Sequence, residues 1–285
     1  MRPIAYVNGA YTPLSQARVS VLDRGFQFGD AVYEVWAVRA GRVFDAPAHM
    51  QRLQRSLDQL RIALPMSQRS LWAVMGETAR RNRVDNGIIY VQISRGAAPR
   101  DHVFPAPPVR PTIVITAKNL DRRALAKRAE IGVNIVSAPD ERWSRCDIKS
   151  VNLLANVLAR QKAKEAGAFE AWLVDRDGFV TEGTSSNAFI VDAAGRLRTR
   201  SLSNAILHGV TRGALLELAR ERQMTVLEAP FTVAEAKLAR EAFISAASNP
   251  AISVVAIDGA QVADGKPGPV ASALRAAYLG AVPEN

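Results

Sequence analysis

Cysteine is almost absent from this chain of 285 residues, which contains one, Cys146. A single cysteine excludes an intrachain disulfide and favours a reducing compartment. No apolar run approaches the ~20 residues that a transmembrane helix needs. The first residues also lack the apolar core of a secretory signal. We therefore expect a cytoplasmic protein that does not enter a membrane.

Acidic residues are fewer than basic ones, 27 against 37, and the formal net charge is +10. The basic residues are nevertheless scattered, and their densest groups, at 80–83 and 121–123, are short and lack interleaved aromatic residues. This pattern is more typical of a solvated surface, or of attraction for small anionic substrates, than of a nucleic-acid groove. We expect no nucleic-acid partner, and a basic nucleic-acid binder is kept as a distant alternative.

Several common motifs of catalytic and metal sites are missing too. No Gly-x-Gly-x-x-Gly or Walker sequence is present, which excludes the usual phosphate-binding loops. The three histidines are far apart in the sequence and lack metal-ligand spacing, so no metal site is expected. The serines of GTSSN, residues 183–187, do not have the spacing of a nucleophile elbow.

The length and the composition, 48% hydrophobic and 22% charged, suit a globular protein of two domains. Strand and helix patterns mix without strict βαβ alternation, so we expect a mixed fold, α+β or α/β. The charged segment 118–128 interrupts the strand pattern and marks the expected linker. The predicted domains are a small N-terminal α/β domain over 1–120 and a larger C-terminal domain over 121–285.

Strands are predicted from β-branched and aromatic runs, and helices from apolar residues three and four positions apart. A hairpin is predicted at 6–11, because Asn8-Gly9 favours a tight turn. Further strands are predicted at 32–38, 87–94, 111–117, 132–137, 171–174, 187–191, 242–246 and 253–257. Helices are predicted at 47–62, 67–83, 153–166, 211–222, 233–240 and 269–279.

Lys149 stands at the start of an apolar run, Val151, Leu153 and Leu154, that predicts a buried helical face. One interpretation is a lysine whose stem packs while its ammonium reaches water, which is the more frequent case for a lysine taken alone. The other is a lysine kept from water and available to form a Schiff base. Lys149 by itself does not decide between them.

Glu182 lies in TEGTSSN, residues 181–187, where the pattern predicts a turn between two apolar strands. The carboxylate could cap local N–H groups, or it could be an anion held beside a cofactor's ring nitrogen. An enzyme that uses pyridoxal 5'-phosphate (PLP) needs a lysine for the aldehyde and an acidic group against the pyridinium. Lys149 and Glu182 together would supply both.

Three segments, in this order, resemble the class IV aminotransferases, the fold-type IV PLP enzymes: RGFQFGDAVYEV at 24–35, RCDIKSVNLL at 145–154 and TEGTSSN at 181–187. The resemblance extends from Tyr6 to Gly259 at least. It implies a two-domain architecture with PLP in the cleft between the domains. It also implies that Lys149 forms the Schiff base and moves the proton between Cα and the cofactor, and that Glu182 holds the pyridine nitrogen.

The same resemblance implies further cofactor contacts. Arg52 resembles the arginine that holds the PLP phosphate, although the alternative is one more exposed helix arginine. Leu207 would lie against the pyridine ring. Val210 and Thr211 open a predicted helix, and their backbone N–H groups suit a phosphate on dipole and hydrogen-bond grounds.

One phosphate contact departs from the family pattern. Many members have a threonine where this chain has Ala247, within SAASNP at 245–250. The backbone N–H of Ala247 or Ser248, or the Ser248 hydroxyl, could substitute for the missing contact. A lost neutral hydrogen bond costs about 0.5–1.5 kcal/mol, so we expect PLP to bind all the same.

The substrate prediction depends on Arg100 and His102 in the loop SRGAAPRDHVFP, residues 94–105. Two residues apart on an extended chain, their side chains project to the same side, and an arginine fork suits a carboxylate. The alternative is a surface loop with solvated charges. In context the loop resembles the α-carboxylate site of D-amino acid transaminases, which a tyrosine matching Tyr33 completes. The resemblance brings Arg100 and His102 from the partner subunit and so implies a homodimer.

Branched-chain enzymes lack this pair and hold the carboxylate differently, so that the opposite Cα–H faces the lysine. We therefore predict transamination between a D-amino acid such as D-alanine and an α-keto acid such as 2-oxoglutarate. A branched-chain or (R)-amine aminotransferase, or an aminodeoxychorismate lyase, is the alternative within the same fold.

Overall fold

The computed structural model describes residues 2–280, and the chain divides into two compact units. Unit 1 comprises Met1–Leu120 and Ile148–Asn152, and unit 2 comprises Asp121–Asp147 and Leu153–Asn285. The segment Ile148–Asn152 carries Lys149, which the sequence had assigned to the C-terminal domain. It belongs to unit 1 because its backbone pairs there: Ser150 forms a β-bridge with Val32.

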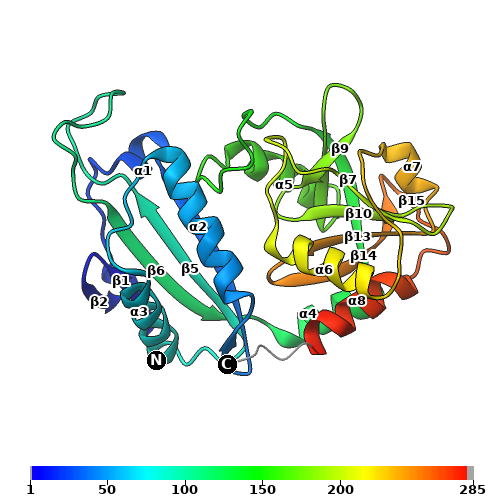
Figure 1. Ribbon diagram of the computed structural model, residues 1–285, viewed down its shortest axis with the longest axis horizontal. Helices are drawn as coiled ribbons and strands as arrows, with labels where there is room; N and C mark the ends of the chain where they lie inside the picture. Colours follow the sequence, from blue (N-terminus) through cyan, green and yellow to red (C-terminus); the bar gives the residue numbers. More distant parts are fainter. Residues whose placement is uncertain (1, 281–285) are drawn as a thin grey trace. The chain divides into compact units, whose positions relative to one another are not determined.

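Unit 1 is built on an antiparallel sheet (Figure 1). Its strands are β1 (Ile4–Val7), β2 (Ala10–Pro13), β3 (Ala31–Arg39), β4 (Arg42–Val43), β5 (Gly87–Ser94) and β6 (Thr112–Asn119). Its helices are α1 (Arg24–Phe28), α2 (Ala46–Leu60) and α3 (Gln68–Arg81), with a 3-10 turn, η1 (Leu14–Gln16). The strand order in the sheet is β2-β1-β6-β5-β3-β4.

Helices α2 and α3 pack on this sheet because each has one apolar face (Figure 1). Leu53 and Leu57 are one turn apart on α2, and Leu71 and Met75 have the same spacing on α3. All four side chains are buried in one cluster with Trp36 of β3. This core joins α2 to β3, and both elements carry polar side chains of the candidate site.

Unit 2 contains a larger, mixed sheet. Its strands are β7 (Val133–Pro139), β8 (Glu170–Val174), β9 (Val180–Gly183), β10 (Asn187–Val191), β11 (Leu197–Thr199), β12 (Val226–Glu228), β13 (Glu241–Ala246), β14 (Asn249–Ile257) and β15 (Ala260–Gln261). Its helices are α4 (Arg122–Ile131), α5 (Leu154–Glu165), α6 (Val210–Glu221), α7 (Val233–Lys237) and α8 (Pro269–Gly280). The order is β12-β11-β10-β13-β14-β7-β8-β9, with β15 on β14. The pairs β11–β12, β14–β7 and β7–β8 are parallel.

The central strands of unit 2 are covered on both faces. Every residue of β10 and almost every residue of β8 and β13 is buried, which is the pattern of continuous apolar runs. Phe189 of β10 stacks on Phe243 of β13 with ring centres 4.7 Å apart. The mixed α/β fold expected from the sequence is confirmed, and each predicted strand and helix is present within a few residues.

Three local expectations were wrong. The segment 118–128 is not an irregular linker, because β6 extends to Asn119 and α4 begins at Arg122, capped by the Asp121 carboxylate. Glu182 does not lie in a turn but inside β9, since Val180–Gly183 pairs with β8. The third concerns α5.

The apolar start of α5 is exposed and not buried. The exposed fractions of Leu154, Val157 and Leu158 are 72%, 57% and 58%. Helix α5 packs instead through small side chains, Ala159 and Ala163, which are buried against β7 and β8. An alanine face lets a helix approach a sheet closely, and it leaves the larger side chains on the opposite side.

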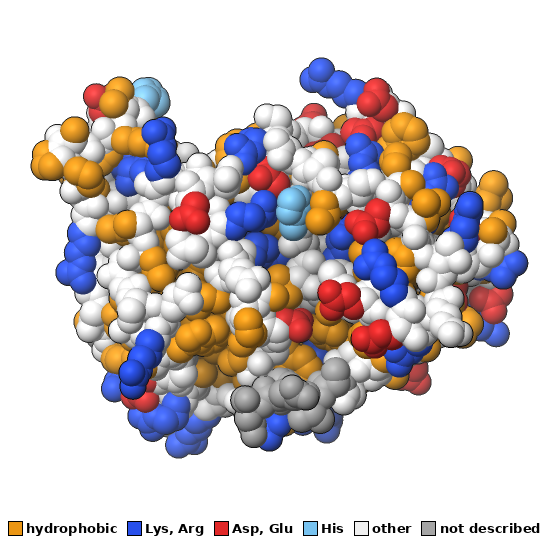
Figure 2. Space-filling model, viewed as in Figure 1, with side chains coloured by type: hydrophobic (Ala, Val, Ile, Leu, Met, Phe, Trp, Pro, Cys, Tyr) orange, Lys and Arg blue, Asp and Glu red, His pale blue; other side chains and the backbone are white. Residues whose placement is uncertain are grey.

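The surface carries charges of both signs. On the face shown in Figure 2, basic, acidic and hydrophobic side chains are interspersed without a continuous basic stripe. Within residues 2–280, none of the helices combines the length and the apolar character that crossing a bilayer requires.

Candidate active site

Lys149 is held by the backbone of unit 1. Its carbonyl oxygen accepts a hydrogen bond from the Tyr33 N–H of β3 (2.9 Å), and its own N–H donates to the Ser56 hydroxyl of α2 (3.3 Å). The half-buried side chain places Nζ 4.2 Å from the centre of the Tyr33 ring, a cation–π arrangement. The structure therefore brings Lys149 and Tyr33 together, as the sequence motifs predicted for two residues of one site.

Arg52 belongs to a buried charged group in unit 1. It donates to the Glu34 carboxylate through Nε (2.9 Å) and Nη2 (2.6 Å), and His49 Nδ1 lies 3.0 Å from the same carboxylate. Burial alone would raise the pKa of Glu34, but the charge and hydrogen bonds of Arg52, with those of His49, hold it well below its usual range. Arg52 is thus an oriented, buried guanidinium, and the alternative of an exposed helix arginine is wrong.

Arg100 and His102 lie on the exposed loop between β5 and β6 and share one aromatic neighbour. The Arg100 guanidinium is 5.1 Å from the centre of the Phe28 ring, and the His102 ring centre is 5.4 Å from it. The two side chains therefore flank the end of α1, close to each other, as their spacing in the sequence predicted.

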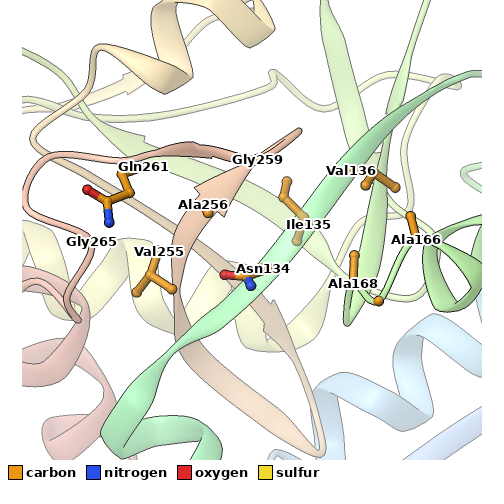
Figure 3. A pocket seen from close by; sticks show the side chains of 11 residues that line it. Asn134, Ile135, Val136, Ala166, Ala168, Val255, Ala256, Gly259, Gln261 and Gly265 are labelled. Atoms are coloured by element: carbon orange, nitrogen blue, oxygen red, sulfur yellow. The ribbon is translucent and has the colours of Figure 1, made fainter.

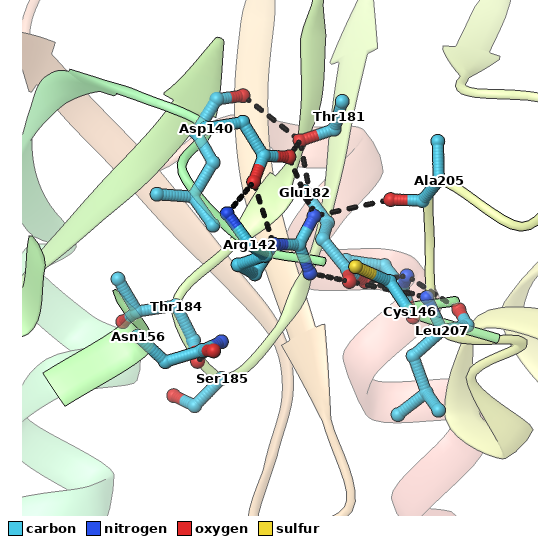
Figure 4. A network of polar contacts seen from close by, with 12 residues as sticks. Asp140, Arg142, Cys146, Asn156, Thr181, Glu182, Thr184, Ser185, Ala205 and Leu207 are labelled. Carbon is cyan, nitrogen blue, oxygen red and sulfur yellow. Dashed lines mark hydrogen bonds and ion pairs between the residues drawn. The ribbon is translucent and has the colours of Figure 1, made fainter. Parts of the chain in front are cut away.

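Glu182 in unit 2 is surrounded by hydrogen-bond donors (Figure 4). The Leu207 N–H lies 3.1 Å from both carboxylate oxygens, and the Asn187 amide donates to Oε2 (3.0 Å). The Arg142 guanidinium is hydrogen-bonded to Oε1. Donors of this kind stabilise the anionic form and fix its orientation. The interpretation of Glu182 as a simple turn cap is therefore excluded.

Arg142 is a member of the site that sequence reasoning missed. Its side chain is 6% exposed and makes paired bonds to Asp140 (2.9 and 2.7 Å) in addition to its bond to Glu182. Burial alone would lower the pKa of Arg142, but the bonds to Asp140 and the charge of Glu182 raise it above its usual value. The only sequence signal was its place among charges in DERWSRCD, 140–147, which does not distinguish it from a solvated arginine.

Cys146 lies near the same charged network (Figure 4). Burial raises the pKa of its thiol to about 11, and the thiol donates to the carbonyl of Trp143 (3.1 Å). The thiol is therefore neutral near pH 7 and is not available as a nucleophile.

The N-terminus of α6 fits an anion such as a phosphate. Helix α6 follows Gly209, whose side chain offers no cap, and a Cβ at this position would lie 2.0 Å from the Asn187 amide oxygen. The buried Thr211 hydroxyl has no hydrogen-bond partner among the residues that the structure describes. A helix N-terminus attracts anions, and an orphan buried hydroxyl beside it is one more donor directed at such a ligand.

Ala247 and Ser248 form the two-residue turn between β13 and β14, where Ala246 pairs with Asn249. Both are partly exposed, and the Ser248 hydroxyl accepts a hydrogen bond from the Asn249 amide (3.2 Å). A backbone turn of this kind presents N–H groups, which is the feature that the sequence analysis asked of these two residues.

A separate hollow of about 350 Å³ lies in unit 2 between β7 and β14 (Figure 3). Aliphatic side chains and backbone form most of its wall, and its polar side chains are the amides of Asn134 and Gln261. It contains none of the predicted site residues. No cluster of His, Cys, Asp and Glu that could hold a metal occurs within residues 2–280.

Comparisons with known proteins agree on one fold. The chain matches the family described as amino-transferase class IV over residues 31–257. The D-alanine aminotransferase of Staphylococcus haemolyticus is 39% identical over 273 residues, which cover 96% of this chain and 95% of that protein. The branched-chain amino acid aminotransferase of Escherichia coli has a TM-score of 0.89 at 26% identity, covering 99% of this chain and 95% of its own.

A second solved structure carries a form of the cofactor in its description. It is a branched-chain amino acid aminotransferase of T.th. with pyridoxamine 5'-phosphate. Its TM-score is 0.88 at 26% identity, and the match covers 98% of this chain and 93% of that chain.

Proposed function

This chain belongs to the class IV aminotransferases, and we propose that it moves the amino group of a D-amino acid such as D-alanine to an α-keto acid such as 2-oxoglutarate. As a member of the family it is a PLP-dependent aminotransferase. The fold alone does not select the substrate, because branched-chain enzymes share it. The observation that carries the proposal is the placement of Arg100 and His102 around Phe28, supported by the similarity to D-alanine aminotransferases.

We propose that Lys149 binds the cofactor's aldehyde through Nζ and then moves the proton at the substrate's Cα. PLP, when bound, withdraws electrons from Cα and so makes its proton acidic. Two backbone hydrogen bonds fix Lys149, and the Tyr33 ring orients its amine. A reacting amine needs such a fixed position, because orientation contributes strongly to the rate.

Glu182 is proposed to hold the ring nitrogen in its protonated form. The carboxylate is buried and anionic, and Arg142, Asn187 and Leu207 hold it in one orientation. The Leu207 side chain is proposed to lie against the ring, since the Leu207 N–H already contacts Glu182.

The phosphate is assigned to residues of both units. Arg52 offers a buried guanidinium that Glu34 orients. Val210 and Thr211 offer the N–H groups of α6 and the orphan hydroxyl. Ala247 and Ser248 are proposed to add N–H groups, or the Ser248 hydroxyl, where many relatives have a threonine.

We also propose that two copies associate and that Arg100 and His102 bind the α-carboxylate in the partner's site, with Tyr33 completing it. The exposed apolar face of α5, formed by Val157 and its neighbours, supports association, since such a face is stabilised by a partner. One buried cysteine suits the cytoplasmic location that we propose for the enzyme.

The substrate is tested by single-turnover spectroscopy. The PLP-loaded enzyme is mixed with D-alanine or L-alanine without a keto acid, and the loss of the cofactor's absorbance is followed. We expect D-alanine to react at least roughly tenfold faster, and Lys149→Ala to react with neither. Charge-assisted bonds contribute about 1.5–3 kcal/mol each, so Arg100→Ala should lower kcat/KM for D-alanine about ten- to a hundredfold.

The outcomes separate the candidates. Faster reaction of L-alanine, or of a branched-chain L-amino acid, would overturn the D-specific assignment and leave the family assignment standing. A preference for (R)-phenylethylamine over every D-amino acid tried would favour the (R)-amine alternative instead.

A further inference from the structure

The loop that carries Arg100 and His102 has little regular structure of its own. Residues 95–111 connect β5 to β6, and most of the segment from Ala97 onward is exposed. Exposed loops are mobile, yet a carboxylate site requires its donors within a fraction of an ångström of one geometry. The structure contains a device that resolves this conflict.

Arg24, at the start of α1, holds the backbone of this loop from below. Its side chain is 4% exposed, and it donates to three consecutive carbonyls, of Asp101 (2.5 Å), His102 (3.3 Å) and Val103 (3.3 Å). Its Nε donates to the Asp30 carboxylate (2.8 Å). The guanidinium therefore fixes the peptide groups on both sides of His102.

Asp30 joins Arg24 to a second buried arginine, Arg95. Arg95 donates to the same carboxylate through Nε (2.7 Å) and Nη2 (3.0 Å). Its Cζ lies 3.5 Å from the centre of the Phe104 ring, so it also holds the far side of the loop. A further bond from Arg95 to the Leu60 carbonyl (2.7 Å) anchors the group to the end of α2.

The two ends of the loop are also drawn together. Gly96 has a φ of +111°, and a Cβ there would lie 2.1 Å from the Arg110 carbonyl oxygen, so glycine is required for this close approach. The Arg24 N–H donates to the Gly96 carbonyl (2.9 Å). The loop is therefore closed at its base and clamped along its length.

We infer that Arg24 and Asp30 are positioning residues for substrate recognition: they hold the loop so that Arg100 and His102 present their donors in one fixed arrangement. This inference rests on the proposed role of the loop in binding the carboxylate. Arg24 touches the loop backbone and the Phe28 ring (4.9 Å), not the substrate, so it acts through Arg100 and His102.

A lysine cannot replace Arg24 in this role. The planar guanidinium carries five N–H donors in a rigid fork, whereas an ammonium has three donors on a flexible stem and cannot bridge three carbonyls and a carboxylate in one plane. The charge alone is therefore insufficient, and Arg24→Lys should behave like Arg24→Met.

The test uses PLP-loaded Arg24→Lys and Arg24→Met, with Arg110→Lys, an exposed arginine of the same loop, as the matched control. Hydrogen–deuterium exchange of the amides of residues 97–106 is measured together with KM and kcat for D-alanine. We expect these amides to exchange at least roughly tenfold faster in both Arg24 variants. We also expect KM to rise about tenfold or more while kcat changes less, with wild-type behaviour in Arg110→Lys.

Two results would overturn the inference. One is wild-type exchange in the loop of folded Arg24 variants. The other is faster exchange with an unchanged KM, which would make the clamp purely structural. If the Arg24 variants do not fold, Asp30→Asn replaces them, because it keeps both arginines and removes their shared charge. Wild-type enzyme that does not turn over D-alanine would refute the proposed function, whereas loss confined to the variants concerns the clamp.

Discussion

At the scale of single residues, this protein buries carboxylates and keeps them charged with arginines. Glu34 is paired with Arg52 in unit 1, and Glu182 with Arg142 in unit 2. An uncompensated buried charge costs several kcal/mol, and removing one member of such a pair costs about 3–5 kcal/mol. Each arginine thus makes it possible for a buried glutamate to remain an anion.

The charge of Glu182 can be removed without changing its shape. Glutamine at this position still accepts the Leu207 N–H, but it can no longer hold a ring nitrogen in the protonated form. We expect Glu182→Gln to bind PLP and to slow the single-turnover reaction with D-alanine by roughly a hundredfold. Glu217→Gln, an exposed carboxylate on α6, is the control and should react at the wild-type rate. An equal rate in Glu182→Gln would refute the assigned role.

At the scale of elements, the helices of unit 2 begin in different ways. Helix α7 has a complete capping box, in which Thr232 and Glu235 satisfy each other's backbone N–H groups. Helix α6 starts after Gly209 with no side-chain cap, and the Thr211 hydroxyl is buried without a partner among residues 2–280. The uncapped N-terminus is the one that we assign to the phosphate.

This contrast predicts opposite effects for two similar substitutions. Thr211→Val removes an unpartnered hydroxyl, so the stability of the PLP-free protein should be unchanged or slightly higher. Its affinity for PLP should fall about tenfold or more, because a hydrogen bond to a charged group contributes about 1.5–3 kcal/mol. Thr232→Val should instead lower stability by about 1 kcal/mol and leave the affinity unchanged. Thermal unfolding and PLP titration measure the two quantities, and an unchanged PLP affinity in Thr211→Val would contradict the phosphate assignment.

At the scale of the whole molecule, the exposed apolar face of α5 indicates a missing partner. Leu154, Val157 and Leu158 are three and four residues apart and so lie on one side of the helix. If Arg100 and His102 act in the partner's site, then association and activity depend on each other.

We expect light scattering to give twice the chain mass of 30.9 kDa for the wild type. Leu158→Glu should shift the mass toward a single chain and lower D-alanine turnover, whereas Leu238→Glu, at a position 83% exposed in unit 2, should do neither. Mixed Lys149→Ala and Arg100→Ala chains should regain about a quarter of the wild-type activity, since half of random dimers contain one intact site. No recovery on mixing, with dimers present, would place Arg100 in the site of its own chain.

The sequence by itself determined the elements and the identity of the central residues. Periodic apolar positions predicted α2, α3 and β5, because hydrophobic spacing is a local property of the chain. Lys149 and Glu182 stood out because each interrupts an apolar context, and Arg100 and His102 because two residues on an extended chain face the same way.

Only the tertiary structure decided which charges are buried and what each one holds. Arg24, Arg52 and Arg142 look like solvated arginines in the sequence, and they acquire their roles from partners far along the chain. The same holds for Lys149, whose short segment packs with unit 1 because β3 supplies its backbone partners. Burial and pairing depend on long-range packing, and local spacing carries no record of them.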